Sequence, residues 1–144
     1  MKSFARSAIL NLQHTFEMKS LAEWREMAMA WTFSRSGNKY GAKKVWTDGI
    51  CFDSKAEERR YQELKLLERA GKISHLYVHV PFQIIPSVVL DGRRHPPTKY
   101  VADFVYEEDG KQVVEDTKGM KTKDYIIKRK LMKHVHNIEV KEVY

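Results

Sequence analysis

The hydrophobic residues of this chain recur at two spacings, one typical of helices and one typical of strands. Residues 54 to 70 show the helical spacing and are followed by Gly71, a residue that favours the C-terminal cap of a helix. Residues 73 to 85 and 137 to 144 alternate in the manner of strands. Another helix is expected after Thr122, and three of its apolar residues are expected to face inward: Ile127, Leu131 and Val135.

Asp-Gly pairs between apolar segments predict tight hairpins. The chain has three of them, Asp48-Gly49, Asp91-Gly92 and Asp109-Gly110. A two-residue type I′ turn needs positive φ at both central positions, and Asp followed by Gly is a favoured pair there. The expected order of elements is therefore hairpin, helix, strands, hairpin, helix and strand. Because Pro81 interrupts the strand at residues 73 to 85, we expect that strand at a sheet edge or at a bend.

The first 36 residues have a different character. Ser20 and Glu23 have the spacing of a capping box, and apolar residues then recur at helical intervals up to residue 32. Residues 34 to 41 have the composition of a linker. We therefore interpret residues 1 to 36 as a helical extension and residues 37 to 144 as one domain. The extension would suit covering the domain or joining two copies of it, although simple packing onto the core is the commoner arrangement.

Composition narrows the class of protein. A length of 144 residues fits one domain, and a hydrophobic content of 42% is too high for wholesale disorder. Cys51 is the only cysteine, which excludes an intrachain disulfide and a cysteine-rich zinc site and suits a reducing compartment. No run of 18 apolar residues occurs, so a cytosolic protein without a membrane partner is expected.

Positive charge is concentrated near the C-terminus. The chain has 26 Lys and Arg against 19 Asp and Glu, a net charge of +7. A basic helix beside an acidic hairpin would suit a metal-dependent nuclease, because lysines hold phosphate while carboxylates hold the cation. A solvated helix face explains the same lysines equally well. We take Lys121, Lys128 and Lys130 as candidates for nucleic-acid contacts. The basic residues between positions 118 and 133 are Lys118, Lys121, Lys123, Lys128, Arg129, Lys130 and Lys133.

The strongest chemical signal comes from the third predicted hairpin, residues 100 to 119. If Asp109 and Gly110 are its turn residues, paired positions run back along both strands until Asp103 lies opposite Asp116. Directly opposed side chains have Cβ atoms about 4.5 to 5.5 Å apart, and like charges placed in this way are destabilising. A divalent cation between the two carboxylates would relieve the repulsion. Mg²⁺ suits such a position, because it prefers oxygen ligands and is commonly held by one or two carboxylates and a substrate phosphate.

Strand alternation adds a lysine to this pair. Lys118 is expected on the same face as Asp116, about 6.6 Å further along the strand, whereas Glu115 is expected on the opposite face. An ammonium group there could position the attacking water and counter charge that develops at phosphorus. The alternative is an exposed hairpin decorated with charges. Val105 and Val114 share the face of the charged residues and favour the buried site instead.

A further acid comes from the helix at residues 54 to 70. Glu57 lies in line with Tyr61 and Leu64 on the inward stripe, so its carboxylate needs a partner. Ser54 and Glu57 also have capping-box spacing, and a role for Glu57 in capping the helix is the stronger interpretation from the residues alone. Both roles can coexist.

These residues together resemble the signature of the PD-(D/E)XK nuclease superfamily. The matching positions are Glu57 in SKAEERRY, Asp103 in YVADF, and Asp116 and Lys118 in VVEDTKG. More narrowly, residues 38 to 143 resemble a phage-borne uncharacterised family of that superfamily. That likeness includes NKYGAKK, EDTKG and a trailing series formed by Thr122, Tyr125, Lys128, Lys130 and Leu131.

The resemblance implies a restriction-endonuclease-like α/β fold, with a mixed four-stranded core sheet flanked by helices. It also implies a phosphodiesterase that depends on Mg²⁺ or Mn²⁺. Asp103 and Asp116 would bind the metal directly, Glu57 would hold it directly or through water, and Lys118 would attend the nucleophile. Lys128 matches a downstream lysine that would contact a phosphate. Ala102 stands where the superfamily name has proline, a residue that is not a metal ligand.

The function expected from this resemblance is a metal-dependent DNA endonuclease in phage DNA metabolism, within the cytoplasm of a bacterial host. By analogy, the special substrate would be a branched recombination intermediate such as a Holliday junction. A junction enzyme needs two sites, so a homodimer is expected, and no small-molecule cofactor is. The alternative is a non-catalytic DNA-binding accessory protein that uses the lysine-rich helix while its acids are structural.

Overall fold

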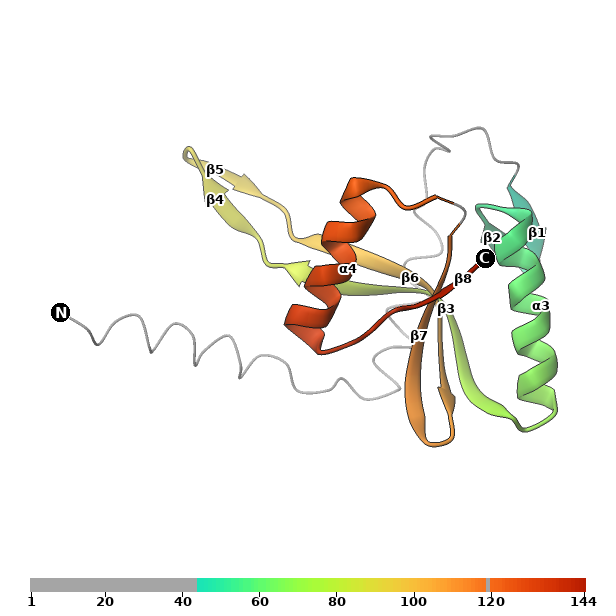
Figure 1. The fold of residues 1–144 in the computed structure, drawn as a ribbon. Helices are drawn as coiled ribbons and strands as arrows, with labels where there is room; N and C mark the ends of the chain where they lie inside the picture. Colours follow the sequence, from blue (N-terminus) through green and yellow to red (C-terminus); the bar gives the residue numbers. More distant parts are fainter. Residues whose placement is uncertain (1–43, 119) are drawn as a thin grey trace.

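The computed structural model describes residues 44–118 and 120–144 (Figure 1). The predicted helical extension, residues 1 to 36, lies outside the described residues. The described elements, in chain order, are β1 (Val45–Thr47), β2 (Ile50–Phe52), α3 (Lys55–Arg69), β3 (Ile73–Ile85), β4 (Val88–Leu90), β5 (Arg93–His95), β6 (Thr98–Glu108), β7 (Lys111–Thr117), α4 (Lys123–His136) and β8 (Lys141–Val143).

The central sheet has four strands in the order β3-β6-β7-β8. The pairs β3–β6 and β6–β7 are antiparallel, whereas β7–β8 is parallel, so the sheet is mixed. This confirms the expectation of an α/β fold built on a mixed four-stranded sheet. β3 lies at one edge, as the interruption by Pro81 predicted, and Pro81 is opposite Val101 of β6. A proline is tolerated there because an edge strand has one side without ladder hydrogen bonds.

The two helices of the described residues, α3 and α4, lie on opposite sides of the sheet (Figure 1). α3 contributes Tyr61 and Leu64 to an apolar cluster that also contains Phe104 and Tyr106 of β6. On the other side, α4 contributes its buried residues to a second cluster with Val105 and Val114. Neither described helix, within residues 44–118 and 120–144, is long and apolar enough to cross a bilayer. The sheet between the two clusters therefore has little contact with solvent along its middle.

The inward face of α4 differs from the prediction. The helix begins after Thr122 as expected, but Ile127 is 57% exposed and Val135 is 40% exposed. The buried residues are Tyr125 and Met132, and Leu131 is half-buried against the same cluster. Residues 125 and 132 are seven positions apart, two helical turns, so they share one stripe. The prediction for Ile127 and Val135 was wrong because α4 has apolar residues on more than one face, and periodicity cannot choose between those faces.

The predicted hairpin turns are confirmed by their backbone angles. Asp48, Asp91 and Asp109 have φ of 53°, 49° and 51°, and the glycine after each also has positive φ. The C-terminal strand is shorter than predicted, because β8 covers only three residues instead of residues 137 to 144. Asn137 ends α4 in the left-handed conformation, with φ 56°, and this turn precedes the strand.

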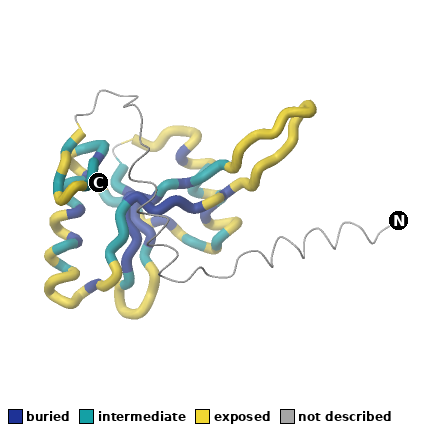
Figure 2. The backbone as a smooth tube through the Cα atoms, turned by 180° about the vertical axis from the view of Figure 1, so that it is seen from behind, coloured by how far each residue is buried: buried dark blue, intermediate teal, exposed yellow. Residues whose placement is uncertain are grey.

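β4 and β5 form a separate two-stranded ribbon that projects from the body of the domain (Figure 1). Its residues are exposed along the whole length of the projection (Figure 2). The ribbon is formed by the second Asp-Gly hairpin and joins β3 to β6. We refer to residues 86 to 97 as the arm.

Candidate functional site

The β6–β7 hairpin has the register that the Asp109-Gly110 turn predicted. Its pairs run from Glu108 opposite Lys111 to Phe104 opposite Glu115. Asp103 and Asp116 occupy the next positions of the same two strands. The backbone N–H of Thr117 donates to Oδ2 of Asp103 at 2.8 Å, so the Asp103 carboxylate itself bridges the strands where the backbone ladder ends. The structure therefore brings together the two aspartates that the sequence pattern singled out.

Both carboxyl groups are buried. Asp103 is 5% exposed and Asp116 is 1% exposed. Burial raises the pKa of Asp103 well above its usual range, and the neighbouring charges of Asp116 and Glu57 raise it further. Two carboxylates so placed cannot both be ionised at low cost unless a cation shares the site. The excess of negative charge here thus favours binding of a proton or a metal ion.

Lys118 supplies one positive charge to the pair. Its Nζ lies 2.8 Å from Oδ1 of Asp116, and the side chain is 28% exposed. Burial by itself would lower the pKa of this ammonium, but Asp103, Asp116 and Glu57 outweigh burial and leave the pKa raised. Lys118 is therefore protonated at neutral pH. In that state it can orient a nucleophile or stabilise negative charge, but it cannot accept a proton as a general base.

Two tyrosines complete the surroundings of Asp116. The hydroxyl of Tyr100 donates to Oδ2 of Asp116, and Nζ of Lys118 lies 5.1 Å from the ring centroid of Tyr125. Burial raises the pKa of Tyr100, and the charge of Asp116 adds to the effect, so this phenol remains a neutral donor. Sequence reasoning missed Tyr100, because strict alternation from Asp103 assigns it to the other face of β6.

Glu57 takes part in the capping of α3, one of the two roles that its position in the sequence left open, and its role at a metal stays a prediction. Its backbone N–H donates to Oγ of Ser54 at 3.1 Å, and its Oε2 accepts from the backbone N–H of Asp53 at 3.0 Å. Glu57 therefore helps to cap the start of α3. It is 9% exposed and close enough to the site to affect the pKa values of Asp103 and Lys118. The start of α3 thus adds a buried acid whose charge acts on Asp103 and Lys118.

A cleft of about 320 Å³ opens beside Asp116 and Lys118. Lys99, at the start of β6, and Lys128, on α4, both line it, so two further positive charges flank the acids. Sequence reasoning named Lys128 but not Lys99, which lies outside the lysine-rich segment. The complete lining is formed by Lys99, Tyr100, Val101, Asp116, Lys118, Met120, Thr122, Asp124, Tyr125 and Lys128.

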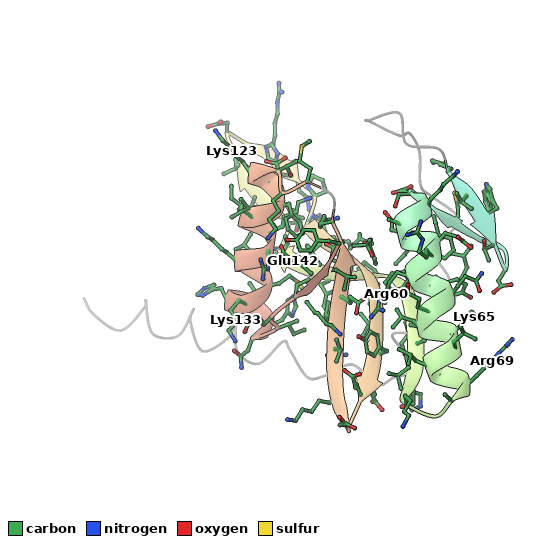
Figure 3. All side chains as sticks on the ribbon, turned by 45° about the vertical axis from the view of Figure 1, so that its right-hand side comes forward. Arg60, Lys65, Arg69, Lys123, Lys133 and Glu142 are labelled. Carbon is green, nitrogen blue, oxygen red and sulfur yellow. The ribbon has the colours of Figure 1, made fainter. Side chains whose placement is uncertain are left out.

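The other two lysines proposed for nucleic-acid contacts lie elsewhere. Nζ of Lys121 forms an ion pair with Oε2 of Glu142 at 2.6 Å, and the same carboxylate also binds Arg129. Lys130 lines a separate hollow beside Lys133 on α4. Figure 3 shows side chains along this helix between the labelled Lys123 and Lys133. Of the three lysines, Lys128 therefore lines the cleft at the acidic site, whereas Lys121 and Lys130 are not among its lining residues.

Glu115 faces away from the site, as strand alternation predicted. It is fully buried, and both of its oxygens accept from Arg60 of α3, at 2.6 and 3.0 Å. The hydroxyl of Tyr106 donates to it at 2.8 Å. Burial would raise the pKa of Glu115, but Arg60 and Tyr106 outweigh burial and leave it lowered. Figure 3 shows Arg60 between α3 and the sheet, where this ion pair joins the helix to β7.

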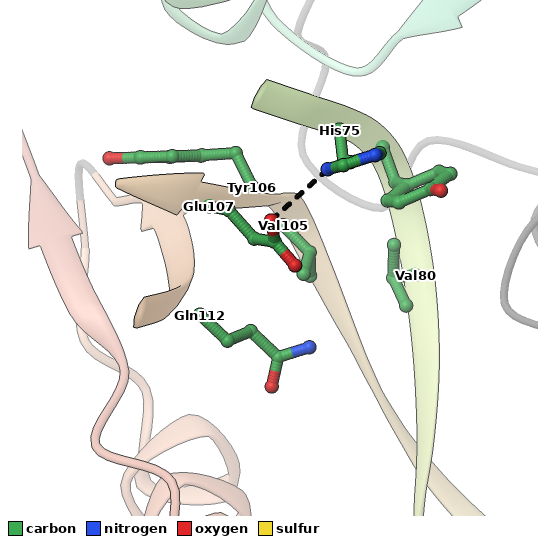
Figure 4. A pocket seen from close by; sticks show the side chains of 7 residues that line it. His75, Val80, Val105, Tyr106, Glu107 and Gln112 are labelled. Carbon is green, nitrogen blue, oxygen red and sulfur yellow. Dashed lines mark hydrogen bonds and ion pairs between the residues drawn. The ribbon is translucent and has the colours of Figure 1, made fainter. Parts of the chain in front are cut away.

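A second, much smaller cavity lies near the opposite end of the hairpin (Figure 4). It has a volume of about 20 Å³, room for a single water molecule, and its lining includes Val80, Val105 and Tyr106. At its edge Nδ1 of His75 lies 3.1 Å from Oε2 of Glu107. A cavity of this size cannot hold a substrate, so the lysine-lined cleft is the better candidate.

The donor atoms of the site suit a hard divalent cation. Oδ1 of Asp116 is buried and receives no well-aligned hydrogen bond, although Lys118 lies within ion-pair distance. Asp103 and Asp116 offer carboxylate oxygens only, the ligand type of Mg²⁺ and Mn²⁺. Within residues 44–118 and 120–144, no three His, Cys, Asp or Glu side chains converge on one point. Two carboxylates nevertheless fit a cation such as Mg²⁺ that shares its remaining positions with water and phosphate.

Comparison with known protein families assigns the chain to one of them. No curated protein matches the chain. A family model described as "Protein of unknown function (DUF1064)" matches residues 37–144. This match covers about three-quarters of the chain and includes every element of the described structure, from β1 to β8. The chain therefore belongs to the DUF1064 family.

Proposed function

We propose that this protein is a metal-dependent endonuclease of the PD-(D/E)XK type that hydrolyses phosphodiester bonds in DNA. One observation carries the proposal: Asp103 and Asp116 are buried side by side, with the ammonium of Lys118 2.8 Å from Asp116. Glu57 of α3 adds a third acid to this electrostatic environment. A purely structural pair of carboxylates would be costly to bury in this way.

Each residue has a defined task in the proposed reaction. Asp103 and Asp116 would hold Mg²⁺ or Mn²⁺, and Glu57 would act on the same ion directly or through a water molecule. The bound cation would lower the pKa of water and withdraw charge from the phosphoryl oxygens. Lys118, held protonated by the acids, would orient the nucleophile and stabilise the charge that develops at phosphorus. Tyr100 would keep Asp116 oriented by donating to its Oδ2.

The cleft supports a polyanionic substrate. Lys99 and Lys128 line it together with Asp116 and Lys118, and this positive charge would attract a phosphate chain to the cleft. We infer that the substrate is DNA, with a branched recombination intermediate such as a Holliday junction as the preferred form. Two symmetric cuts at a junction require two sites, so the active species would be a homodimer, in phage DNA metabolism within the bacterial cytoplasm.

A second candidate function is DNA binding without catalysis. In it the protein is a non-catalytic DNA-binding accessory protein of phage replication or recombination. The basic residues on the exposed side of α4 favour this alternative, because they would bind a DNA backbone whether or not the acids bind metal (Figure 3).

The experiment that separates the two candidates is a cleavage assay on labelled linear duplex, single-stranded and four-way DNA. Each substrate is incubated with the full chain in Mg²⁺, Mn²⁺ or EDTA. The nuclease proposal expects cleavage that needs metal and is abolished by Asp103→Asn and by Asp116→Asn. Glu108→Gln is the matched control, since Glu108 is an exposed acid of the same hairpin and should leave the rate unchanged.

Binding of the same substrates without metal identifies the accessory function. If no substrate is cleaved with either metal, and Asp116→Asn binds DNA as well as the wild type or more tightly, the acids are structural and the nuclease proposal is wrong. Cleavage that persists in Asp116→Asn would contradict the assigned metal site in the same way. The preferred substrate follows from the relative rates on the three forms of DNA.

A further inference from the structure

The arm, residues 86 to 97, stands apart from both apolar clusters of the domain. Every residue from 85 to 97 is exposed, and the ribbon extends well beyond the sheet (Figures 1 and 2). Val89 is 67% exposed and Leu90 is 54% exposed, so large apolar side chains lie near its tip. Exposed apolar residues on a projection of this kind point to a binding partner, because packing within the domain does not use them.

The arm combines apolar and basic residues on both of its faces. Directly paired residues of an antiparallel ribbon lie on the same face. Leu90 pairs with Arg93, and Val89 pairs with Arg94. Each face therefore presents an aliphatic side chain next to a guanidinium group. Asp91 at the turn is the only acid of the arm, against two arginines and His95.

Three prolines stiffen the base of the arm. Pro86 lies in the connection between β3 and β4, and Pro96 and Pro97 form the connection between β5 and β6. They fall between the last pair of the main sheet, Ile85 with Thr98, and the first pair of the arm, Val88 with His95. Proline fixes φ and lacks a backbone donor, so it ends the main ladder while limiting the conformations of the connection. The arm is thus built to project rather than to extend the sheet.

The arm lies next to the candidate active site along the chain. β5 leads directly into β6, where Lys99 lines the cleft with Asp116 and Lys118. An extended chain advances about 3.3 Å per residue, so Arg94 and Lys99 are separated by at most roughly 17 Å. That distance equals about five base-pair steps of duplex DNA. A duplex whose backbone enters the cleft therefore has its neighbouring groove within reach of the arm.

We propose that the arm is a DNA-binding ribbon that enters a groove of the duplex flanking the cleavage site. Arg93 and Arg94 contact phosphates there, while Val89 and Leu90 contact sugars and base edges. Two-stranded ribbons fit DNA grooves, and an apolar residue beside arginine is the combination that such ribbons use. A second copy of the chain is the less favourable occupant, because pairing two arms would bring their arginines together. The inference rests on the proposed function insofar as the partner is DNA.

The test measures binding apart from cleavage. The full chain is titrated by fluorescence anisotropy against labelled duplex and four-way DNA in EDTA, over a range of salt concentrations. The double variant Arg93→Ala/Arg94→Ala is expected to bind at least tenfold more weakly. Its slope of log affinity against log salt is expected to fall by about 0.9 for each phosphate that the variant no longer neutralises. Leu90→Ser is expected to weaken binding severalfold with no change in that slope, because it removes an apolar side chain and no charge.

Lys111→Ala is the matched control, because Lys111 is an exposed cation at the start of β7 beside the other projecting turn. Equal affinity and salt slope for the arginine double variant, Lys111→Ala and the wild type would overturn the proposal. The proposal would also be overturned if sedimentation showed a dimer for the wild type and a monomer for the arm variants, because the arm would then bind a second copy of the chain. If DNA binding by the wild type depends on the arm but no DNA is cleaved in Mg²⁺ or Mn²⁺, the arm proposal is supported and the nuclease proposal is wrong. A wild-type chain that binds no DNA would overturn both.

Discussion

The ammonium of Lys118, the residue that follows β7, lies 2.8 Å from Oδ1 of Asp116, two residues earlier in the chain. This contact decides which chemistry is open to the lysine, because the acids keep its pKa raised. A protonated lysine acts by charge and by orientation. The pairing also leaves Asp116 with one oxygen facing the lysine and the other accepting from Tyr100.

Lys118→Met should therefore lower kcat by about 10² to 10³, the cost typical of removing one donor that stabilises a developing oxyanion. KM for DNA should change little, because Lys118 is one of several cations at the cleft. Steady-state cleavage kinetics measure both quantities, and Lys111→Met, at the start of β7, is the control for removal of a lysine. An unchanged kcat would show that Lys118 only offsets the charge of the acids.

Tyr100 is predicted to be a positioning residue for Asp116. Tyr100→Phe removes the hydroxyl that donates to Oδ2 while keeping the ring in its apolar cluster. The concentration of Mg²⁺ needed for half-maximal rate should rise severalfold, because Asp116 no longer has the donor that orients it. Tyr144→Phe, at an exposed tyrosine, should leave it unaltered. A lower melting temperature with no change in the Mg²⁺ requirement would mean that Tyr100 only packs.

Asp103 should destabilise the metal-free protein at neutral pH. A carboxyl group whose pKa is raised on folding binds its proton more tightly in the folded state, so ionising it costs stability. Stability from this group is greatest below the usual pKa of an aspartate and decreases as pH rises through the raised value. In EDTA, Asp103→Asn should thus melt at a higher temperature than the wild type, by a margin that grows with pH. A constant margin from pH 4 to 8 would contradict the buried acid pair.

The Arg60–Glu115 ion pair should have the opposite pH dependence. The pKa of Glu115 is lowered on folding, so its stabilisation is present above the usual pKa of a glutamate and is lost as pH falls through the lowered value. Glu115→Gln leaves Arg60 without its main partner and should cost roughly 3 kcal/mol, the low end for a broken buried pair. Urea unfolding at pH 7 and pH 3 measures this, and the difference from the wild type should shrink at pH 3.

The acid pair could be predicted because a local rule determines a long-range contact. A two-residue turn at Asp109 and Gly110 sets the register of the whole hairpin, and the register brings Asp103 and Asp116 together. The same alternation correctly separated Lys118 from Glu115. The capping of α3 by Ser54 was also predictable, because it depends on residues within one helical turn.

The remaining parts of the site depend on packing between distant elements. Lys99 and Tyr100 line the cleft because β6 packs beside α4. No short sequence pattern predicts that packing. Nζ of Lys121 forms an ion pair with Glu142 of β8 at 2.6 Å, a contact that no short pattern predicts, and contact of Lys121 with DNA stays a prediction. Ile127 was predicted to face inward but is exposed, because α4 has more apolar residues than one buried stripe needs.

The most direct test of the account is the number of Mn²⁺ ions bound by the full chain, measured from the electron paramagnetic resonance signal of free Mn²⁺ during a titration. A saturable site is expected in the wild type and in Glu108→Gln, and is expected to be absent in both Asp103→Asn and Asp116→Asn. Equal binding by all four proteins, or no saturable binding by any, would contradict it.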